Sequence, residues 1–302
     1  PLSICGNAGA VYKALGHDEI DTLYDYSKRN ITPTITKLNA KCALSAKPRV
    51  RTVAGVGLVS TMVNRCCYQK KLKSIAQSRG IPIVIGTPKY YGGWNTMVQQ
   101  VLPPNCKKLF GYDFPKCDRA MPNILRIAAD EILLSGHVGN CCSESDVFYR
   151  LSNEASQVLH EAVYIEGGFY SKRGGTSSGD STTAYANSAF NLFQVVTSCV
   201  NKILLNPEST FRDFQSNMYS SIYLDTEEQN TKECFNHIQS RNPVIILSDD
   251  GVCGTLEGPD DLDIETFGNT LYVQNNVYMP TNKCWETSNL AEGPLEFCSQ
   301  HS

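Results

Sequence analysis

No apolar run in this sequence is long enough to cross a lipid bilayer, which argues against a chain built from membrane-spanning helices. A signal peptide is also missing and the chain begins at Pro1 rather than methionine, so we expect an excised segment of a longer protein. The thirteen cysteines form no CxxC pair, which argues against a zinc ribbon or a redox motif, and without secretory context so many cysteines favour a reducing compartment. With 302 residues, 41% of them hydrophobic, the chain can bury a large core in two lobes.

Acidic residues are missing from one long stretch. Between Tyr26 and Tyr112 there is no Asp or Glu, whereas fifteen Lys and Arg residues occur there. Such a block attracts polyanions. From Gly174 to the end the balance reverses, with five basic residues against seventeen acidic ones, although the net charge of the whole chain is only −3. The first half therefore suits phosphates, and the second suits metal ions or is a solvated acidic surface.

Internal repeats and low-complexity linkers are absent too, so we expect the chain to alternate between lobes rather than to divide once. Apolar periodicity predicts helices over residues 57–79, 121–134 and 143–164. It predicts short strands over residues 81–86 and 108–113, the second of which ends at Asp113 and is stopped by Pro115.

Two adjacent carboxylates follow an apolar run in the acidic half. Residues 244–247 are Val-Ile-Ile-Leu, and Ser248, Asp249, Asp250 and Gly251 come next. This pattern predicts a buried hairpin with its acids at the turn. Two charges there need a positive partner, and a divalent metal ion is the usual one. The alternative is a solvated Asp-Gly turn, which is a common hairpin signal.

Asp113 is a second candidate metal ligand, and Asp118 follows it by five positions. Asp113 lies 136 positions before Asp249 (249 − 113), so only the fold can bring the two carboxylates together. We predict that it does.

Residues 31–56 mix threonines, valines, prolines and bases, which predicts a basic β-ribbon. Side chains alternate across a strand, so in one unbroken strand the basic residues that are an even number of positions apart would point to the same side. A triphosphate could neutralise them there. Pro48 confines such a strand to an edge or a bulge. The alternative is an ordinary basic surface. The bases concerned are Lys41, Lys47, Arg49 and Arg51.

A glycine- and hydroxyl-rich loop at residues 172–182 leads into a helix on which Thr183 and Asn187 share a face. Free N–H groups at a helix start suit anions and sugar hydroxyls. The loop is not a P-loop, because it lacks the Gly-Lys-Thr/Ser ending. An ordinary capped helix start remains the alternative.

Three potential soft metal ligands occur within six residues: His137, Cys141 and Cys142. A structural zinc site needs a fourth ligand, which the local sequence does not supply. Ordinary buried thiols are the alternative.

Five segments together resemble the polymerase motifs of nidovirus RNA-dependent RNA polymerases, within them a coronavirus or torovirus relative. GYDFPKCDRAMPN, GGTSSGDSTTAYANS, LSDDG and FCSQH resemble motifs A, B, C and E, and KCALSAKPRVRTVAGV resembles motif F. The resemblance implies an α+β right-hand fold, with an antiparallel palm sheet flanked by helices and interleaved fingers. Fingers would comprise residues 1–77 and 116–175, and palm residues 78–115 and 176–302.

The resemblance also implies residue roles in template-directed transfer of NTPs to an RNA 3′ end. Asp113, Asp249 and Asp250, with Ser248 beside them, would hold two Mg²⁺ or Mn²⁺ ions about 3.5–4 Å apart. Lys283 would donate a proton to pyrophosphate. The triphosphate would bind Lys41, Lys47, Arg49 and Arg51. The ribose 2′-hydroxyl would be sensed by Asp118, Ser178, Thr183 and Asn187. The primer grip would contain Cys298, Ser299 and Gln300. His137, Cys141 and Cys142 would form an incomplete zinc site.

Family likeness further implies RNA template and primer as partners, small viral processivity proteins and other replicase subunits, and membrane-associated replication complexes in the host cytoplasm. The thumb would be absent, so we expect little or no activity from this segment alone. Two alternatives stay open from the residues: a reverse transcriptase or DNA polymerase palm, and a non-catalytic RNA-binding module. Asp118 and Asn187 argue against the first, and metal-dependent nucleotide addition would exclude the second.

Overall fold

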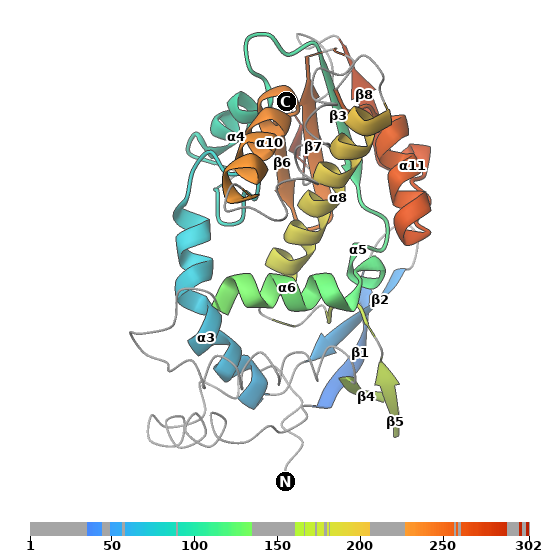
Figure 1. The fold of residues 1–302 in the computed structure, drawn as a ribbon. Helices are drawn as coiled ribbons and strands as arrows, with labels where there is room; N and C mark the ends of the chain where they lie inside the picture. The colour runs from blue at the N-terminus through green and yellow to red at the C-terminus, as the bar shows by residue number, and fades with distance from the viewer. Residues whose placement is uncertain are drawn as a thin grey trace. The chain divides into compact units, whose positions relative to one another are not determined.

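The computed structural model describes residues 35–43, 49–55, 58–88, 90–134, 161–165, 167–172, 174–177, 180, 182–205, 227–256, 258, 261–288, 296–297 and 300–301. The chain forms two compact units, and each consists of two separate segments. Unit 1 is Pro1–Ile75 with Asp118–Asn187, and unit 2 is Ala76–Cys117 with Ser188–Ser302. The chain therefore alternates between units, as Figure 1 allows the reader to follow. The names fingers and palm for these units stay a prediction.

Unit 1 contains a four-stranded sheet in the order β2-β1-β4-β5. β1 (Ile35–Ala43) and β2 (Arg49–Gly55) are antiparallel, β1 and β4 (Glu161–Ile165) are parallel, and β4 and β5 (Gly168–Lys172) are antiparallel. The predicted basic β-ribbon is present as two antiparallel strands rather than one unbroken strand, and the two strands satisfy each other's backbone groups. In this register Lys41 is opposite Arg51, and Ala43 is opposite Arg49.

The end of the helix predicted over residues 143–164 is also wrong, because β4 occupies residues 161–165. Its backbone pairs on both sides, with β1 and with β5, and this tertiary pairing overrides the local helical pattern. Residues 143–160 lie outside the described part of the chain.

Helices account for much of the remaining described part of unit 1. α3 (Leu58–Gln77) matches the predicted helix over residues 57–79 and runs across the boundary at Ile75. α5 (Cys117–Ala120) is a single turn, and α6 (Asn123–Leu134) matches the prediction for 121–134. α8 (Thr183–Leu205) begins in unit 1 and continues in unit 2.

Unit 2 is organised around an antiparallel sheet in the order β6-β7-β3-β8. Its strands are β3 (Lys108–Asp113), β6 (Val244–Leu247), β7 (Asp250–Thr255) and β8 (Cys284–Thr287). Both β3 and the β6–β7 hairpin form where the apolar runs predict them. The four strands lie side by side in Figure 1.

The two faces of this sheet are covered by different helices, as the alternation of side chains along β3 requires. Leu109 packs in a cluster with Met97 and Val101 of α4 (Gly93–Val101). Phe110 and Tyr112, of the opposite parity, contact Phe267 of α11 (Ile264–Asn275), with ring centroids 6.3 and 4.5 Å apart. Helices on both faces bury the sheet, so the α+β prediction is confirmed.

The strand predicted over residues 81–86 is wrong. Only an isolated parallel bridge forms there, between Ile83 and Ile246. Pro82 has no N–H to offer a ladder, and the chain turns at Gly86, which has a φ of +80°.

The remaining described elements are α10 (Glu227–Arg241), the 3₁₀ turn η1 (Thr281–Lys283) and the two-stranded pair β9 (Glu296–Phe297) and β10 (Gln300–His301). None of the described helices has the length and hydrophobicity needed to span a membrane.

Candidate active site

Antiparallel pairing of β3 with β7 brings the distant carboxylates together. The ladder aligns Asp113 with Asp250, and the Phe114 N–H donates to the Asp249 carbonyl oxygen over 2.7 Å. Asp113 therefore ends its strand directly beside Asp249 in the turn and Asp250 at the start of β7. The predicted convergence of these carboxylates is therefore present at one end of the unit 2 sheet.

The turn between β6 and β7 contains Ser248 and Asp249, and Ser248 has a φ of +61°. Left-handed backbone is rare for residues other than glycine, so contacts outside the turn must hold it. Ser188 and Asn191 of α8 provide them: the Ser248 N–H donates to Ser188 Oγ over 2.7 Å, and Asn191 Nδ2 donates to the Ser248 carbonyl oxygen over 3.3 Å.

The carboxylates of this site influence one another. Partial desolvation raises the pKa of Asp249, although its side chain still reaches solvent, and the nearby negative charge of Asp113 raises that pKa further. A hydrogen bond from Ser248 and the charge of Lys283 act in the opposite direction. Lys283 itself forms an ion pair with Asp113. The site thus concentrates negative charge, and a cation relieves it.

The carboxylate oxygens of Asp113, Asp249 and Asp250 are the kind of ligand that Mg²⁺ and Mn²⁺ prefer. A divalent ion would fit here, because its charge would offset the repulsion between these carboxylates. Among the residues that the structure describes, no three His, Cys, Asp or Glu side chains are grouped as metal ligands. The Asp113 carboxylate is paired with Lys283 in this structure.

In unit 1, hydrogen bonds hold the loop before α8. The Thr176 N–H donates to the Asp118 carbonyl oxygen over 2.7 Å, and Thr176 Oγ1 donates to Asn187 Oδ1 over 3.1 Å. Thr183 Oγ1 donates to the Ser177 carbonyl oxygen over 2.6 Å. A Cβ on Gly175, at φ +72°, would lie 2.5 Å from the Asp118 carbonyl oxygen, so glycine is required there. Asp118, Thr183 and Asn187 therefore border one loop.

A buried ionic network in unit 1 was not predicted. Arg126 of α6 donates from Nε to Asp130 over 2.9 Å and from a terminal nitrogen to Asp180 over 2.7 Å and Thr182 over 2.6 Å. Asn64 of α3 also donates to Asp180, over 3.2 Å. Arg126 is only 3% exposed, so these acceptors replace its lost water. The four-residue spacing of Arg126 and Asp130 was the available signal.

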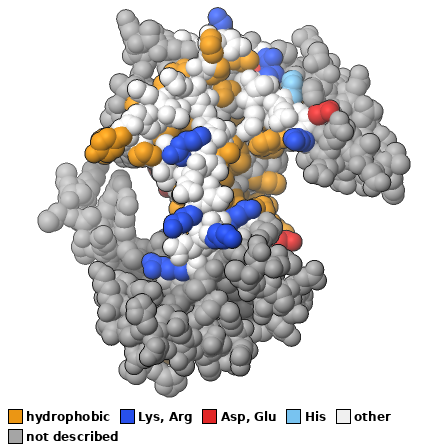
Figure 2. Space-filling model, turned by 90° about the vertical axis from the view of Figure 1, so that its left-hand side faces the viewer, with side chains coloured by type: hydrophobic (Ala, Val, Ile, Leu, Met, Phe, Trp, Pro, Cys, Tyr) orange, Lys and Arg blue, Asp and Glu red, His pale blue; other side chains and the backbone are white. Residues whose placement is uncertain are grey.

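Helix α3 contributes a basic surface to unit 1. Its sequence contains no acidic residue, and Arg65, Lys70 and Lys73 are exposed. Figure 2 shows Lys and Arg side chains gathered on the described face that includes this helix.

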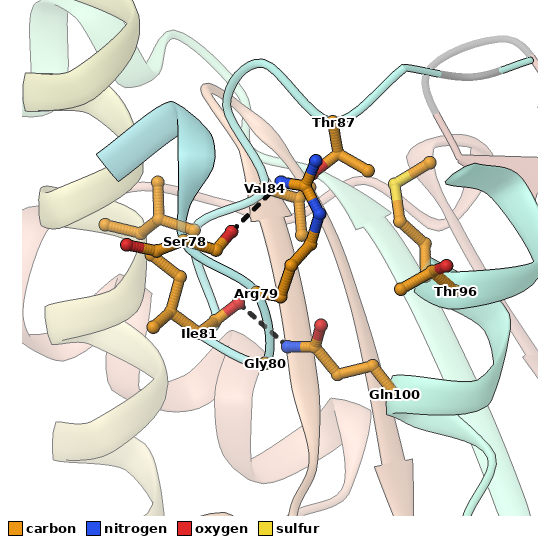
Figure 3. A pocket seen from close by; sticks show the side chains of 10 residues that line it. Ser78, Arg79, Gly80, Ile81, Val84, Thr87, Thr96 and Gln100 are labelled. Carbon is orange, nitrogen blue, oxygen red and sulfur yellow. Dashed lines mark hydrogen bonds between the residues drawn. The ribbon is translucent and has the colours of Figure 1, made fainter. Parts of the chain in front are cut away.

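Unit 2 also has a small pocket, but it is separate from these groups. Ten residues between positions 78 and 100 line it (Figure 3). Arg79 donates to the Ser78 carbonyl oxygen over 3.1 Å, and Gln100 donates to that of Ile81 over 2.8 Å. No predicted site residue is among its lining residues, and its hydrogen bonds hold the segment that follows α3.

The remaining predicted site residues fall into two groups. Lys41, Arg49, Arg51 and Gln300 lie in strands whose backbone alone is described. The others lie outside the described residues: His137, Cys141, Cys142, Lys47, Ser178, Cys298 and Ser299. The zinc site and the complete primer grip therefore stay predictions.

Comparison with known proteins agrees with this architecture. The family described as viral RNA-dependent RNA polymerase matches residues 10–285, so the chain belongs to that family. It is 47% identical over its whole length to replicase polyprotein 1ab of Bat coronavirus 512/2005, and 46% identical to those of Bat coronavirus HKU9 and of Murine coronavirus (strain JHM). These identities agree with the nidovirus resemblance. The chain spans only 5%, 4% and 4% of these polyproteins.

The fold is shared with a solved polymerase of another virus. The crystal structure of the RNA-dependent RNA polymerase of a human picorbirnavirus superimposes with a TM-score of 0.59, covering 87% of this chain and 42% of that one. At 10% sequence identity, this likeness concerns the fold alone.

Proposed function

We propose that this chain carries the catalytic centre of an RNA-directed RNA polymerase, which transfers NTPs to an RNA 3′ end in viral genome replication and transcription. One observation carries the proposal: Asp113 meets Asp249 and Asp250 at one end of the unit 2 sheet, in a chain of the viral RNA-dependent RNA polymerase family. The family match also favours RNA synthesis over the reverse transcriptase alternative.

Asp113, Asp249 and Asp250 would hold two Mg²⁺ or Mn²⁺ ions. Such ions, when bound, lower the pKa of an attacking hydroxyl and stabilise the pyrophosphate that leaves. The raised pKa of Asp249 next to Asp113 supports this assignment, because the repulsion that raises it is what a cation removes. Lys283 would give a proton to the leaving pyrophosphate, and its ion pair with Asp113 supports this role.

Substrate recognition would fall mainly to the other residues. Lys41, Lys47, Arg49 and Arg51 would neutralise the triphosphate, and the β1–β2 register that aligns Lys41 with Arg51 supports a shared role for these two. Asp118, Ser178, Thr183 and Asn187 would sense the ribose 2′-hydroxyl at the loop before α8. The basic surface of α3 suits an RNA backbone.

The wider assignments follow from the relatives. We propose that unit 1 serves as fingers and unit 2 as palm, with Cys298, Ser299 and Gln300 in the primer grip. The partners would be an RNA template and primer, small viral processivity proteins and other replicase subunits. The work would take place at membrane-associated replication complexes in the host cytoplasm.

The test is an Asp249→Asn variant of the polymerase that contains this chain, assayed by primer extension. Because this change removes one carboxylate charge from the proposed metal ligands, we expect nucleotide addition to fall at least about 100-fold. Glu265→Gln, which removes an exposed carboxylate from the first turn of α11, is the matched control and should keep the normal rate. An Asp249→Asn protein as fast as this control would refute the proposal, and faster incorporation of deoxyribonucleotides would favour the DNA-synthesising alternative.

A further inference from the structure

The proposed metal ligand Asp249 follows a residue with unfavourable backbone geometry. Ser248 adopts a φ of +61° as the first of the two turn residues between β6 and β7. An L-residue leaves this region readily unless other contacts favour it, and any change there would move the carboxylate that follows. The contacts that hold Ser248 therefore decide where Asp249 points.

Both backbone polar groups of Ser248 are engaged by one face of α8. Ser188 Oγ accepts from the Ser248 N–H over 2.7 Å, and Asn191 Nδ2 donates to the Ser248 carbonyl oxygen over 3.3 Å. Ser188 and Asn191 are three positions apart on the helix, and so they lie on the same side of it. Both are fully buried, so water does not compete for these bonds.

Tyr112 completes the arrangement from the strand that carries Asp113. Its hydroxyl donates to Asn191 Oδ1 over 2.9 Å, which fixes the amide with its Nδ2 toward Ser248. The Tyr112 ring is itself held against Phe267, and the side chain is 4% exposed.

A continuous set of hydrogen bonds thus runs from Tyr112 through Asn191 to Ser248. Its two ends are the immediate neighbours of Asp113 and Asp249. Backbone pairing of β3 with β7 fixes the strands, and the Phe114 N–H bond to the Asp249 carbonyl oxygen holds one side of the turn, whereas this set holds Ser248 on the other side.

We propose that Ser188, Asn191 and Tyr112 are positioning residues that hold the Ser248 backbone and thereby set the distance between the carboxylates of Asp113 and Asp249. The inference rests on the proposed function. Removing one of these bonds should leave the substrates bound but misplace Asp249, and small misplacements of reacting groups reduce rates strongly.

The test compares two buried serines of the same helix in the polymerase that contains this chain. In Ser188→Ala the acceptor for the Ser248 N–H is lost. In Ser198→Ala an equally buried hydroxyl is lost, but that hydroxyl bonds only within the helix, to the Gln194 carbonyl oxygen over 2.8 Å. We expect Ser188→Ala to lower kcat about tenfold and to raise the Mg²⁺ concentration needed for half-maximal rate, with KM for NTP unchanged. Ser188→Thr, which restores a hydroxyl, should recover much of the rate.

Mn²⁺ binding, followed by electron paramagnetic resonance, gives a readout that does not depend on turnover. Ser188→Ala should weaken it several-fold, and Ser198→Ala should not. If the two alanine variants affect the rate and Mn²⁺ binding equally, the hydrogen bonds to Ser248 have no role beyond the packing of α8. This result would overturn the inference. So would a Ser188→Ala protein with normal kcat and normal metal dependence.

Tyr112→Phe provides the second variant if Ser188→Ala does not fold, because it removes one hydroxyl and keeps the ring against Phe267. It should show the same loss of kcat and of Mn²⁺ affinity, and normal behaviour in both would contradict the proposal. Failure of the proposed function has a different signature: the unaltered protein and Ser198→Ala would both fail to add nucleotides.

Discussion

At the scale of single residues, the chain uses buried charge to fix a loop. Asp180 accepts hydrogen bonds from Arg126, Asn64 and the Thr182 N–H, although it belongs to a loop otherwise rich in glycine and hydroxyl groups. The Arg126 charge and the hydrogen bonds from Thr182 and Arg126 lower the pKa of Asp180 despite its desolvation, which acts in the opposite direction. Its carboxylate form is therefore the one that stabilises the fold.

This shift predicts a pH-dependent stability. Because the folded pKa of Asp180 is lower than its unfolded value near 3.8, the stabilisation is fully present above about pH 4 and is lost as the pH falls through the folded pKa. Asp180→Asn should lower the free energy of unfolding by about 2 kcal/mol at pH 7. The difference from the unaltered chain should shrink in acid, below the unfolded pKa. Urea unfolding at a series of pH values measures it.

Glu131→Gln is the matched control for that experiment, since Glu131 is an exposed carboxylate on α6, the helix that carries Arg126. It should change stability by less than about 0.5 kcal/mol at every pH. An Asp180→Asn protein that is as stable as this control at pH 7 would show that the ionic network does not stabilise unit 1.

At the scale of elements, α3 predicts how RNA affinity responds to salt. Lys70 and Lys73 are exposed on a helix that has no acidic residue. If they contact phosphates, Lys70→Gln with Lys73→Gln should weaken RNA binding for all sequences alike. The slope of log K against log salt should fall by about 1 for each lysine removed. Filter binding between low and moderate salt measures this slope.

Lys232→Gln on α10 serves as the comparison, because Lys232 is exposed but belongs to a helix with several acidic residues. Its salt slope should equal that of the unaltered protein. If the unaltered protein, the Lys70→Gln and Lys73→Gln double variant and Lys232→Gln all have the same slope, α3 does not bind RNA.

The sequence predicts a helix or strand well when neighbouring residues determine it. It predicts poorly when pairing with strands distant in the sequence determines it. The strand at Lys108–Asp113 and the hairpin at Val244–Thr255 were predicted because their apolar runs and turn residues are local signals. The local pattern predicts a helix where the strand Glu161–Ile165 forms, because this strand depends on pairing with β1 and β5. At residues 81–86 an apolar run suggested a strand, but Pro82 and the turn at Gly86 leave only a bridge.

The sequence also predicts only part of the candidate active site. Carboxylates are conspicuous in sequence, so Asp113, Asp249 and Asp250 could be selected before their convergence was visible. Ser188 and Asn191 could not, because serine and asparagine in a helix give no sign of what lies opposite. Only the tertiary contact to Ser248 shows what they hold.

At the scale of the whole molecule, the 302-residue chain by itself should extend a primer feebly or not at all. The chain spans only 5% of the polyprotein of Bat coronavirus 512/2005, and we propose that residues of the longer polymerase are needed for elongation. Primer extension by the purified chain, compared with the longer polymerase that contains it, tests this. Robust elongation by the short chain would show that the two units suffice.

The β3–β7 register has a consequence for how this protein can change over time. Side chains alternate between the faces of a sheet, so inserting or deleting one residue in β3 or β7 would turn Asp113 or Asp250 toward the opposite face. Substitutions in these strands leave that parity untouched. Length changes of a single codon within them should therefore be lethal to the virus, whereas the same changes in the connecting loops should be tolerated more often.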